Sequence, residues 1–94
     1  MSLMITAKVQ LLWTLDIIND NHDRKGFLKR LGFKIKQLRT EQDLSQADFG
    51  IEIDVEKSNV SRMESGRVNP RTYTLYKVAK ALNISLSELL NFDE

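Results

Sequence analysis

The spacing of apolar residues beyond residue 22 is the feature that most restricts the fold of this chain. Between residues 23 and 41, apolar side chains recur at steps of three and four, at Phe27, Leu28, Leu31, Ile35 and Leu38. Lys, Arg and Gln occupy most of the positions between them. Such a period places the apolar side chains on one face of a helix and the charged ones on the other. The spacing therefore predicts an amphipathic helix that covers a core.

A capping signal and a glycine indicate two further short helices. Ser45 and Asp48 have the spacing of a reciprocal capping pair, which satisfies free backbone N–H groups at a helix start. This pair predicts a helix over about residues 46–53. The apolar pattern is then interrupted and resumes at Val60, and Gly66 supplies a left-handed stop. The segment therefore predicts two helices joined by a tight turn.

Two more helices are predicted in the last third of the chain. An apolar stripe follows the loop at residues 69–70, at Leu75, Val78, Ala79 and Leu82. It ends at Asn83, a residue that often replaces glycine in a left-handed helix cap. Ser85 and Glu88 form a second capping pair. The last helix is expected to have three leucines on its inner side, Leu86, Leu89 and Leu90. Five short helices with short connections predict a compact all-α domain.

The composition excludes several classes of function. A chain of 94 residues can enclose one hydrophobic core, and it contains no cysteine and a single histidine, His22. Thiolate catalysis, cysteine-ligated metals and a histidine-based metal site are therefore excluded. No stretch is apolar enough for a membrane span. We expect a cytoplasmic protein that is not an enzyme, with no cofactor, no metal, no membrane partner and no small-molecule effector within the chain.

The first twenty residues follow a different pattern. Apolar residues occupy alternate positions from Ile5 to Ile17, which is the period of a strand with one buried face. A lone strand would have no partner in a helical chain. Residues 1–22 are therefore interpreted as an N-terminal arm. It either pairs with its copy in a homodimer, through residues 4–18, or forms an extra helix laid on the domain of residues 23–94.

Two sequence blocks at a fixed separation make the pattern of residues 27–92 more specific. One is Leu44-Ser45-Gln46, and the other runs from Glu64 through Gly66 to Pro70. Together with the apolar spacing, these blocks strongly resemble the lambda-repressor-like, or Cro/C1-type (XRE), helix-turn-helix family. The resemblance implies a five-helix bundle in which the second and third helices, about residues 45–66, form the DNA-reading unit of a transcriptional regulator.

The physical requirements of a DNA-reading helix agree with this assignment. Such a helix must anchor one face in the core and present polar groups on the other, because the major groove admits a helix and displays base-specific donors and acceptors. Val60 and Met63 are the expected anchors. The positions assigned to base contacts are Lys57, Ser58, Asn59, Ser61 and Arg62. Asparagine suits adenine, lysine and arginine suit guanine, and serine suits several bases.

The resemblance also assigns residues to the DNA backbone and to the core. Backbone contacts, which set the register but carry no sequence information, are expected from Gln46, Ser65, Arg67, Asn69 and Arg71. Gln46 lies at the positive N-terminus of its helix. Arg39 and Glu64 occupy positions that a partly buried salt bridge joins in this family. The pair is expected to orient the reading helix.

Three positions depart from the family pattern. Asp54 stands in the turn where the family usually has glycine, so we expect a left-handed aspartate at a strain of roughly 1 kcal/mol. Glu56 stands at the usual Ser or Thr cap of the reading helix, where its carboxylate would either repel phosphate or accept a hydrogen bond from a cytosine amino group. Gly50 replaces a common alanine, which eases close helix approach and weakens the helix.

Charge is distributed unevenly along the chain. Residues 23–43 carry seven Lys and Arg against three acids, whereas residues 44–72 carry four against five. DNA affinity must then come from placed contacts and helix N-termini more than from a broad positive field. We expect a homodimeric repressor that binds double-stranded DNA sequence-specifically, on half-sites about 34 Å apart or multiples of that. The alternative is an antitoxin or protein-interaction module of the same fold.

Overall fold

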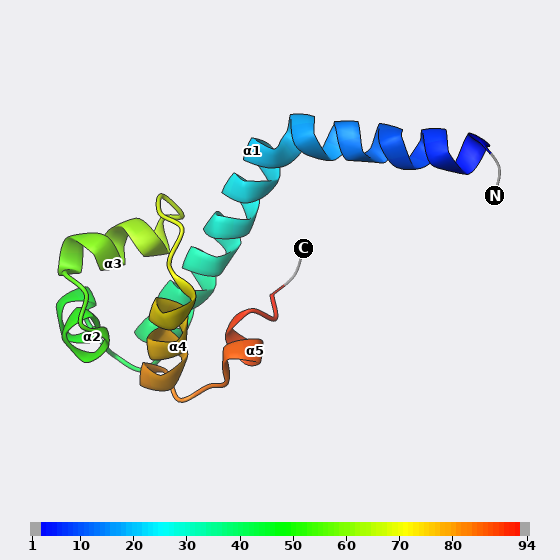
Figure 1. Cartoon of the computed structure of the whole chain (residues 1–94). Helices are drawn as coiled ribbons and strands as arrows, with labels where there is room; N and C mark the ends of the chain where they lie inside the picture. Colours follow the sequence, from blue (N-terminus) through cyan, green and yellow to red (C-terminus); the bar gives the residue numbers. More distant parts are fainter. Residues whose placement is uncertain (1–2, 93–94) are drawn as a thin grey trace.

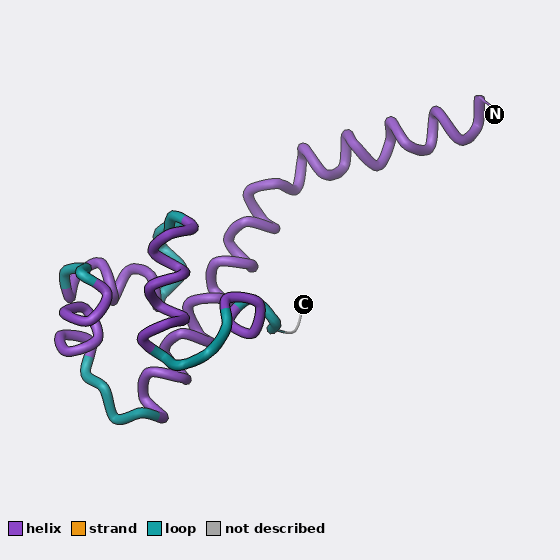
Figure 2. Tube along the Cα trace, turned by 60° about the horizontal axis from the view of Figure 1, so that its bottom comes forward, coloured by secondary structure: helices purple, strands orange, loops and turns teal. Residues whose placement is uncertain are grey.

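A computed structural model describes the backbone of residues 3–92 and the side chains of residues 22–92. The helices of this part are α1 (Leu3–Glu41), α2 (Gln46–Ile53), α3 (Lys57–Glu64), α4 (Thr72–Ala81) and α5 (Leu86–Leu89). No strand occurs between residues 3 and 92 (Figure 2). The all-α class with five helices that the sequence predicts is confirmed.

α1 joins the predicted arm and the predicted first helix of the domain into one element. It is helical from Leu3 to Glu41, and its N-terminal half bends and projects away from the other four helices (Figure 1). The interpretation of the arm as a strand is therefore wrong. The alternative of a helix is confirmed, although this helix projects from the domain and does not lie on it. A helix satisfies its backbone hydrogen bonds within the segment, whereas a lone strand leaves them open.

The projecting half of α1 gives the molecule its elongated shape. The described chain extends over 56 × 23 × 20 Å. Despite the length of α1, no helix among residues 3–92 combines the length and the hydropathy needed to cross a membrane.

The hydrophobic core lies between the C-terminal half of α1 and the four short helices. Its buried residues are Leu31, Ile35, Phe49, Ile53, Val60, Met63, Val78, Ala79, Leu82 and Leu89. The expected anchors of α3 belong to it, since Val60 is 0% and Met63 is 4% exposed. α3 is therefore held on its inner side by the same core that holds α1, α2 and α4.

Two apolar residues that the sequence places on inner faces lie at the surface. Phe27 is 43% exposed, and its ring packs against Phe92 with the ring centroids 5.3 Å apart. Leu90 is 39% exposed. It follows a helix of only four residues, in which Leu89 is fully buried and Leu86 half-buried. A single helical turn has too narrow an inner face to bury all three leucines.

The short helices α2 and α5 begin with one of the two bonds of each predicted capping pair: the serine oxygen accepts a hydrogen bond, whereas the serine N–H does not donate to the carboxylate of Asp48 or Glu88. Ser45 Oγ accepts a hydrogen bond from the Asp48 N–H at 3.0 Å, and Ser85 begins α5 in the same way. Gly66 and Asn83 adopt positive φ angles of 77° and 60°. Each of these two residues adopts the left-handed conformation, which prevents the helix from continuing.

α1 and α3 approach each other closely at Gly32. A Cβ atom on Gly32 would lie 2.5 Å from the carbonyl oxygen of Glu64 and would also collide with the carbonyl oxygen of Met63. Both are backbone atoms of α3, so no side-chain rotation can make room. The missing side chain at residue 32 therefore sets the distance between α1 and the C-terminal end of α3.

We expect Gly32→Ala to lower the free energy of unfolding by about 1–3 kcal/mol, because the backbone of α3 must move to admit the methyl group. The matched control is Gly26→Ala on the same helix, where the new Cβ would meet only the end of the Arg30 side chain, at 3.3 Å. Alanine is the better helix former by about 1 kcal/mol, so this control should not be destabilised. Urea unfolding followed by circular dichroism compares the two. Equal stability would contradict the close contact.

Candidate nucleic-acid interface

The turn between α2 and α3 is built around two residues that keep the chain compact. Asp54 has φ 56° and ψ 49°, the left-handed conformation for which the family usually has glycine. The Val55 N–H donates to the Gly50 carbonyl at 2.8 Å. A Cβ on Gly50 would collide with the carbonyl oxygen of Val55. The absence of a side chain at Gly50 therefore lets Val55 approach α2 closely. Asp54 supplies the left-handed backbone conformation that reverses the chain.

No side chain caps the start of α3. Glu56 is the N-cap residue and is extended, but its carboxylate makes no capping hydrogen bond. This agrees with the weak cap expected there. The exposed carboxylate lies beside Lys57, the first residue of α3.

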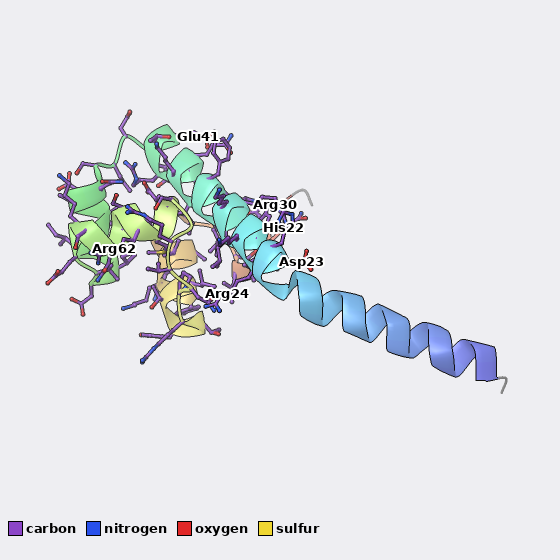
Figure 3. The ribbon with its side chains drawn as sticks, turned by 90° about the horizontal axis from the view of Figure 1, so that it is seen from above. His22, Asp23, Arg24, Arg30, Glu41 and Arg62 are labelled. Atoms are coloured by element: carbon purple, nitrogen blue, oxygen red, sulfur yellow. The ribbon has the colours of Figure 1, made fainter. Side chains whose placement is uncertain are left out.

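The exposed face of α3 carries the residues that the sequence assigns to base contacts. Lys57, Ser58, Asn59 and Arg62 are exposed, and Ser61 is half-buried. Arg62 lies on α3, in the part of the molecule distant from the projecting half of α1 (Figure 3). The helix therefore has one fully buried side and one side that is polar and accessible.

Asn59 and Arg62 are joined on this face by a hydrogen bond. Arg62 Nη1 donates to Asn59 Oδ1 at 2.9 Å. The bond engages one of the two lone pairs of Asn59 Oδ1, so the pair presents the amide NH₂ and the rest of the guanidinium as donors and keeps one acceptor position on the amide oxygen. The sequence pattern assigns each of the two residues its own base contact and does not join them. Their separation by three positions on a helix was the signal that could have indicated the contact.

The connection between α3 and α4 carries the other predicted backbone contacts. Ser65, Arg67, Asn69 and Arg71 are all exposed. Arg67 Nε donates to Ser65 Oγ at 2.8 Å, and Ser65 Oγ donates to the carbonyl of Arg62 at 3.1 Å. These bonds hold the Arg67 side chain near the C-terminal end of α3. Arg71 is the N-cap residue of α4, and no side chain caps that helix start.

A buried ion pair joins the ends of α1 and α3. Arg39 Nε lies 2.5 Å from Glu64 Oε2, and Arg39 Nη2 donates to Glu64 Oε1 at 3.0 Å. The two side chains are 8% and 3% exposed. Arg39 Nη1 also donates to the Leu44 carbonyl at 2.6 Å, and Gln46 Nε2 donates to Glu64 Oε1 at 3.0 Å. Among the described residues, no buried side-chain nitrogen or oxygen lacks a partner.

This network changes what Gln46 can offer to a ligand. The sequence assigns Gln46 to the DNA backbone, but one hydrogen of its amide nitrogen is directed to Glu64. The second amide hydrogen and the backbone N–H groups of Gln46 and Ala47 remain for a phosphate, since the Asp48 N–H already donates to Ser45 Oγ. The spacing of Gln46 and Glu64 in the sequence gave no signal of this contact.

The fold and the two-sided α3 define a helix-turn-helix protein. α2 and α3 are short, they are joined by a tight turn, and the second helix is buried on one side and polar on the other. Residues 35–89 match the helix-turn-helix family. The chain belongs to this family of DNA-binding transcriptional regulators, as its resemblance to Cro/C1-type proteins implied.

Individual relatives are consistent with the family. The chain is 41% identical over 63 residues to control protein C.MunI of Mycoplasma sp, a match that covers 66% of this chain and 85% of that protein. It is 34% identical over 61 residues to the cryptic phage CTXphi transcriptional repressor RstR of Vibrio cholerae, covering 65% and 55%. Its fold is similar to the crystal structure of the restriction-modification controller protein C.AhdI from Aeromonas hydrophila. That match has a TM-score of 0.64 and 32% identity, and it covers 66% of this chain and 94% of the other.

Replacing Glu64 with alanine should lower the free energy of unfolding by about 3 kcal/mol, because Arg39 would stay buried without its partner. DNA affinity should fall as well, since α3 would lose its support from α1. Thermal unfolding and titration of a DNA duplex measure the two effects. The double variant Arg39→Met/Glu64→Leu removes both charges and should be more stable than Glu64→Ala. Unchanged unfolding of Glu64→Ala would refute the importance of the pair.

Proposed function

We propose that this chain is a repressor that binds double-stranded DNA sequence-specifically by inserting α3 into the major groove. The observation that supports the proposal is the polar outer face of a helix whose inner face is fixed in the core. The major groove accommodates one helix and displays a different donor and acceptor pattern for each base pair. The similarity to control protein C.MunI and to the controller protein C.AhdI favours a role in the control of gene expression.

The base contacts are assigned to the exposed positions of α3 and to the half-buried one beside them. These are Lys57, Ser58, Asn59, Ser61 and Arg62. Arg62 engages one lone pair of the Asn59 amide oxygen, so the remaining N–H groups of the guanidinium are held on this face as donors. Guanine presents two acceptors, O6 and N7, in the major groove, whereas adenine presents an acceptor and a donor. We therefore infer that Arg62, positioned by its bond to Asn59, reads a guanine with its remaining N–H groups.

The backbone contacts are assigned to both flanks of α3. One group lies in the connection that follows α3: Ser65 and Arg67, which are joined by a hydrogen bond, then Asn69, and finally Arg71 at the uncapped start of α4. The other group is Gln46 and the first turn of α2. Helix N-termini carry a partial positive charge and free N–H groups, which bind phosphate. These contacts would fix the depth and the direction of α3 in the groove.

A homodimer would let the protein read a longer site. One reading helix covers only a few base pairs, so two copies on half-sites about 34 Å apart, or multiples of that, would bind with useful selectivity. The projecting half of α1 supports this arrangement, because residues 4–18 are rich in apolar residues and the segment extends away from the other helices (Figure 1). Pairing of this segment with its copy would remove apolar side chains from water.

Selection of bound duplexes from a random pool tests the reading helix. The wild-type chain should enrich a defined sequence that contains a guanine. Arg62→Ala should abolish the preference at that guanine, and Lys57→Ala should abolish it at a different position, at about 1–3 kcal/mol each. Lys80→Ala, an exposed lysine on α4, is the control and should leave every preference unchanged. Absence of any enriched sequence would refute the proposal, and binding only in the presence of a co-expressed protein would favour the antitoxin alternative.

The oligomeric state of the full chain tests the arm. We expect a mass of about twice 10.9 kDa by sedimentation equilibrium for the wild type. Leu11→Glu/Leu15→Glu should reduce it to the mass of one chain, because two charges would enter the apolar pairing segment. Thr6→Glu/Gln10→Glu adds the same charge at two polar positions that share the other side of the helix, and it should remain dimeric. A wild-type chain that is monomeric at micromolar concentration would exclude dimerisation through this arm.

A further inference from the structure

α1 and the connection between α3 and α4 form a groove beside the reading unit. From α1, it is lined by the cations Arg24, Lys25 and Lys29, and from the connection by Ser65, Arg67 and Asn69. All six residues are exposed. The three residues of the connection were assigned to the DNA backbone, whereas the three cations of α1 had no role. The groove therefore joins assigned and unassigned cations in one surface.

The two walls of the groove are fixed relative to each other. A Cβ on Gly66 would lie 2.8 Å from the Cα and the N of Lys29, so the connection lies directly on the backbone of α1. The positive φ of 77° at Gly66 turns the chain at this contact. Arg67, the next residue, is further restrained by its hydrogen bond to Ser65. The backbone positions of α1 that carry the cations are consequently fixed relative to the backbone of Arg67.

The charges of α1 are sorted by side at this level of the helix. Arg24 lies on the side that faces the connection, whereas His22, Asp23 and Arg30 lie on the other side (Figure 3). Lys25 and Lys29 are one helical turn apart and line the same groove. The groove therefore combines the positive charge of Arg24, Lys25, Lys29 and Arg67, with the nearby carboxylate of Asp23 directed away from it.

The reading unit itself lacks a positive field. Residues 44–72 carry four Lys and Arg against five acids, and residues 23–43 carry seven against three. DNA binding gains affinity from the release of counterions, in proportion to the number of phosphates that cations neutralise. If α3 lies in the major groove, the strand that passes the connection continues toward the adjoining surface. That surface is the basic groove on α1.

We propose that the DNA backbone extends beyond the α3–α4 connection onto α1, where Arg24, Lys25 and Lys29 bind phosphates together with Arg67. This inference rests on the proposed function and adds a second contact area to it. The contacts are sequence-independent, because they involve phosphates and not base edges. The groove therefore contributes to affinity and to salt dependence but not to base preference.

The salt dependence of binding tests the groove in the full chain. The dissociation constant for the selected duplex is measured between 0.05 and 0.3 M salt for the wild type and for Arg24→Gln/Lys25→Gln. Each lost phosphate contact lowers the slope of log affinity against log salt by about 0.9, so we expect the slope to fall by about 2 for each bound copy, or about 4 for a dimer, and the affinity at low salt to fall by about tenfold or more. Base preference in the random pool should be unchanged.

A charge-matched variant is the control. Arg30→Gln/Lys80→Gln removes one arginine and one lysine outside the groove, since Arg30 is on the opposite side of α1 and Lys80 is on α4. Its slope should equal that of the wild type. Equal slopes for the two double variants, with sequence-specific binding retained, would overturn the α1 contact and leave the proposed function intact. A wild type that selects no sequence would instead refute the proposed function and this inference together.

Discussion

The buried ion pair between Arg39 and Glu64 is the contact on which the reading unit depends. A charge left alone in a protein core is costly, so the ends of α1 and α3 must stay where both bonds of the pair can form. Gln46 and the Leu44 carbonyl complete the hydrogen bonding, which ties the start of α2 to the same two side chains. α2 and α3 are thus oriented from the inside. The residues on the outer face of α3 do not pack in the core and are accessible to a ligand.

Local chemistry explains which parts of the fold could be predicted from the sequence. The bounds of α2 and the left-handed residues 54 and 83 follow from caps and turns, which depend on a few neighbouring residues. The exposure of Phe27 and Leu90 depends on which element lies opposite, and periodicity does not contain that information. The strand interpretation of the arm failed for a related reason. Alternation describes the faces of a strand, but a strand also needs a hydrogen-bonding partner, and a helix does not.

The same distinction applies to the candidate site. Four of the five α3 positions expected to be exposed are exposed, because exposure there follows from the burial of Val60 and Met63 in the core, whereas Ser61 is half-buried. The bonds among polar side chains were not predicted. Gln46 turns toward Glu64 because Glu64 Oε1 can accept a second hydrogen bond beside that from Arg39, and Arg62 turns toward Asn59, which lies three residues before it on the same helix. Such choices depend on the assembled neighbours of each group.

In the proposed function, selectivity and affinity are assigned to different surfaces, and the charge pattern gives a physical reason. Acids around α3, including Glu56 at its start, keep the reading unit from binding any duplex tightly through charge alone. DNA of another sequence then binds weakly, because no general electrostatic attraction at α3 compensates for the missing hydrogen bonds to its bases. The cations of α1 act over about a Debye length and bring the chain to DNA without regard to sequence. If those cations lay on α3 instead, non-specific binding would rise at the surface that must discriminate. Their position on the neighbouring helix, fixed to the connection at Gly66, keeps the attraction close to the reading face without adding it to the base contacts.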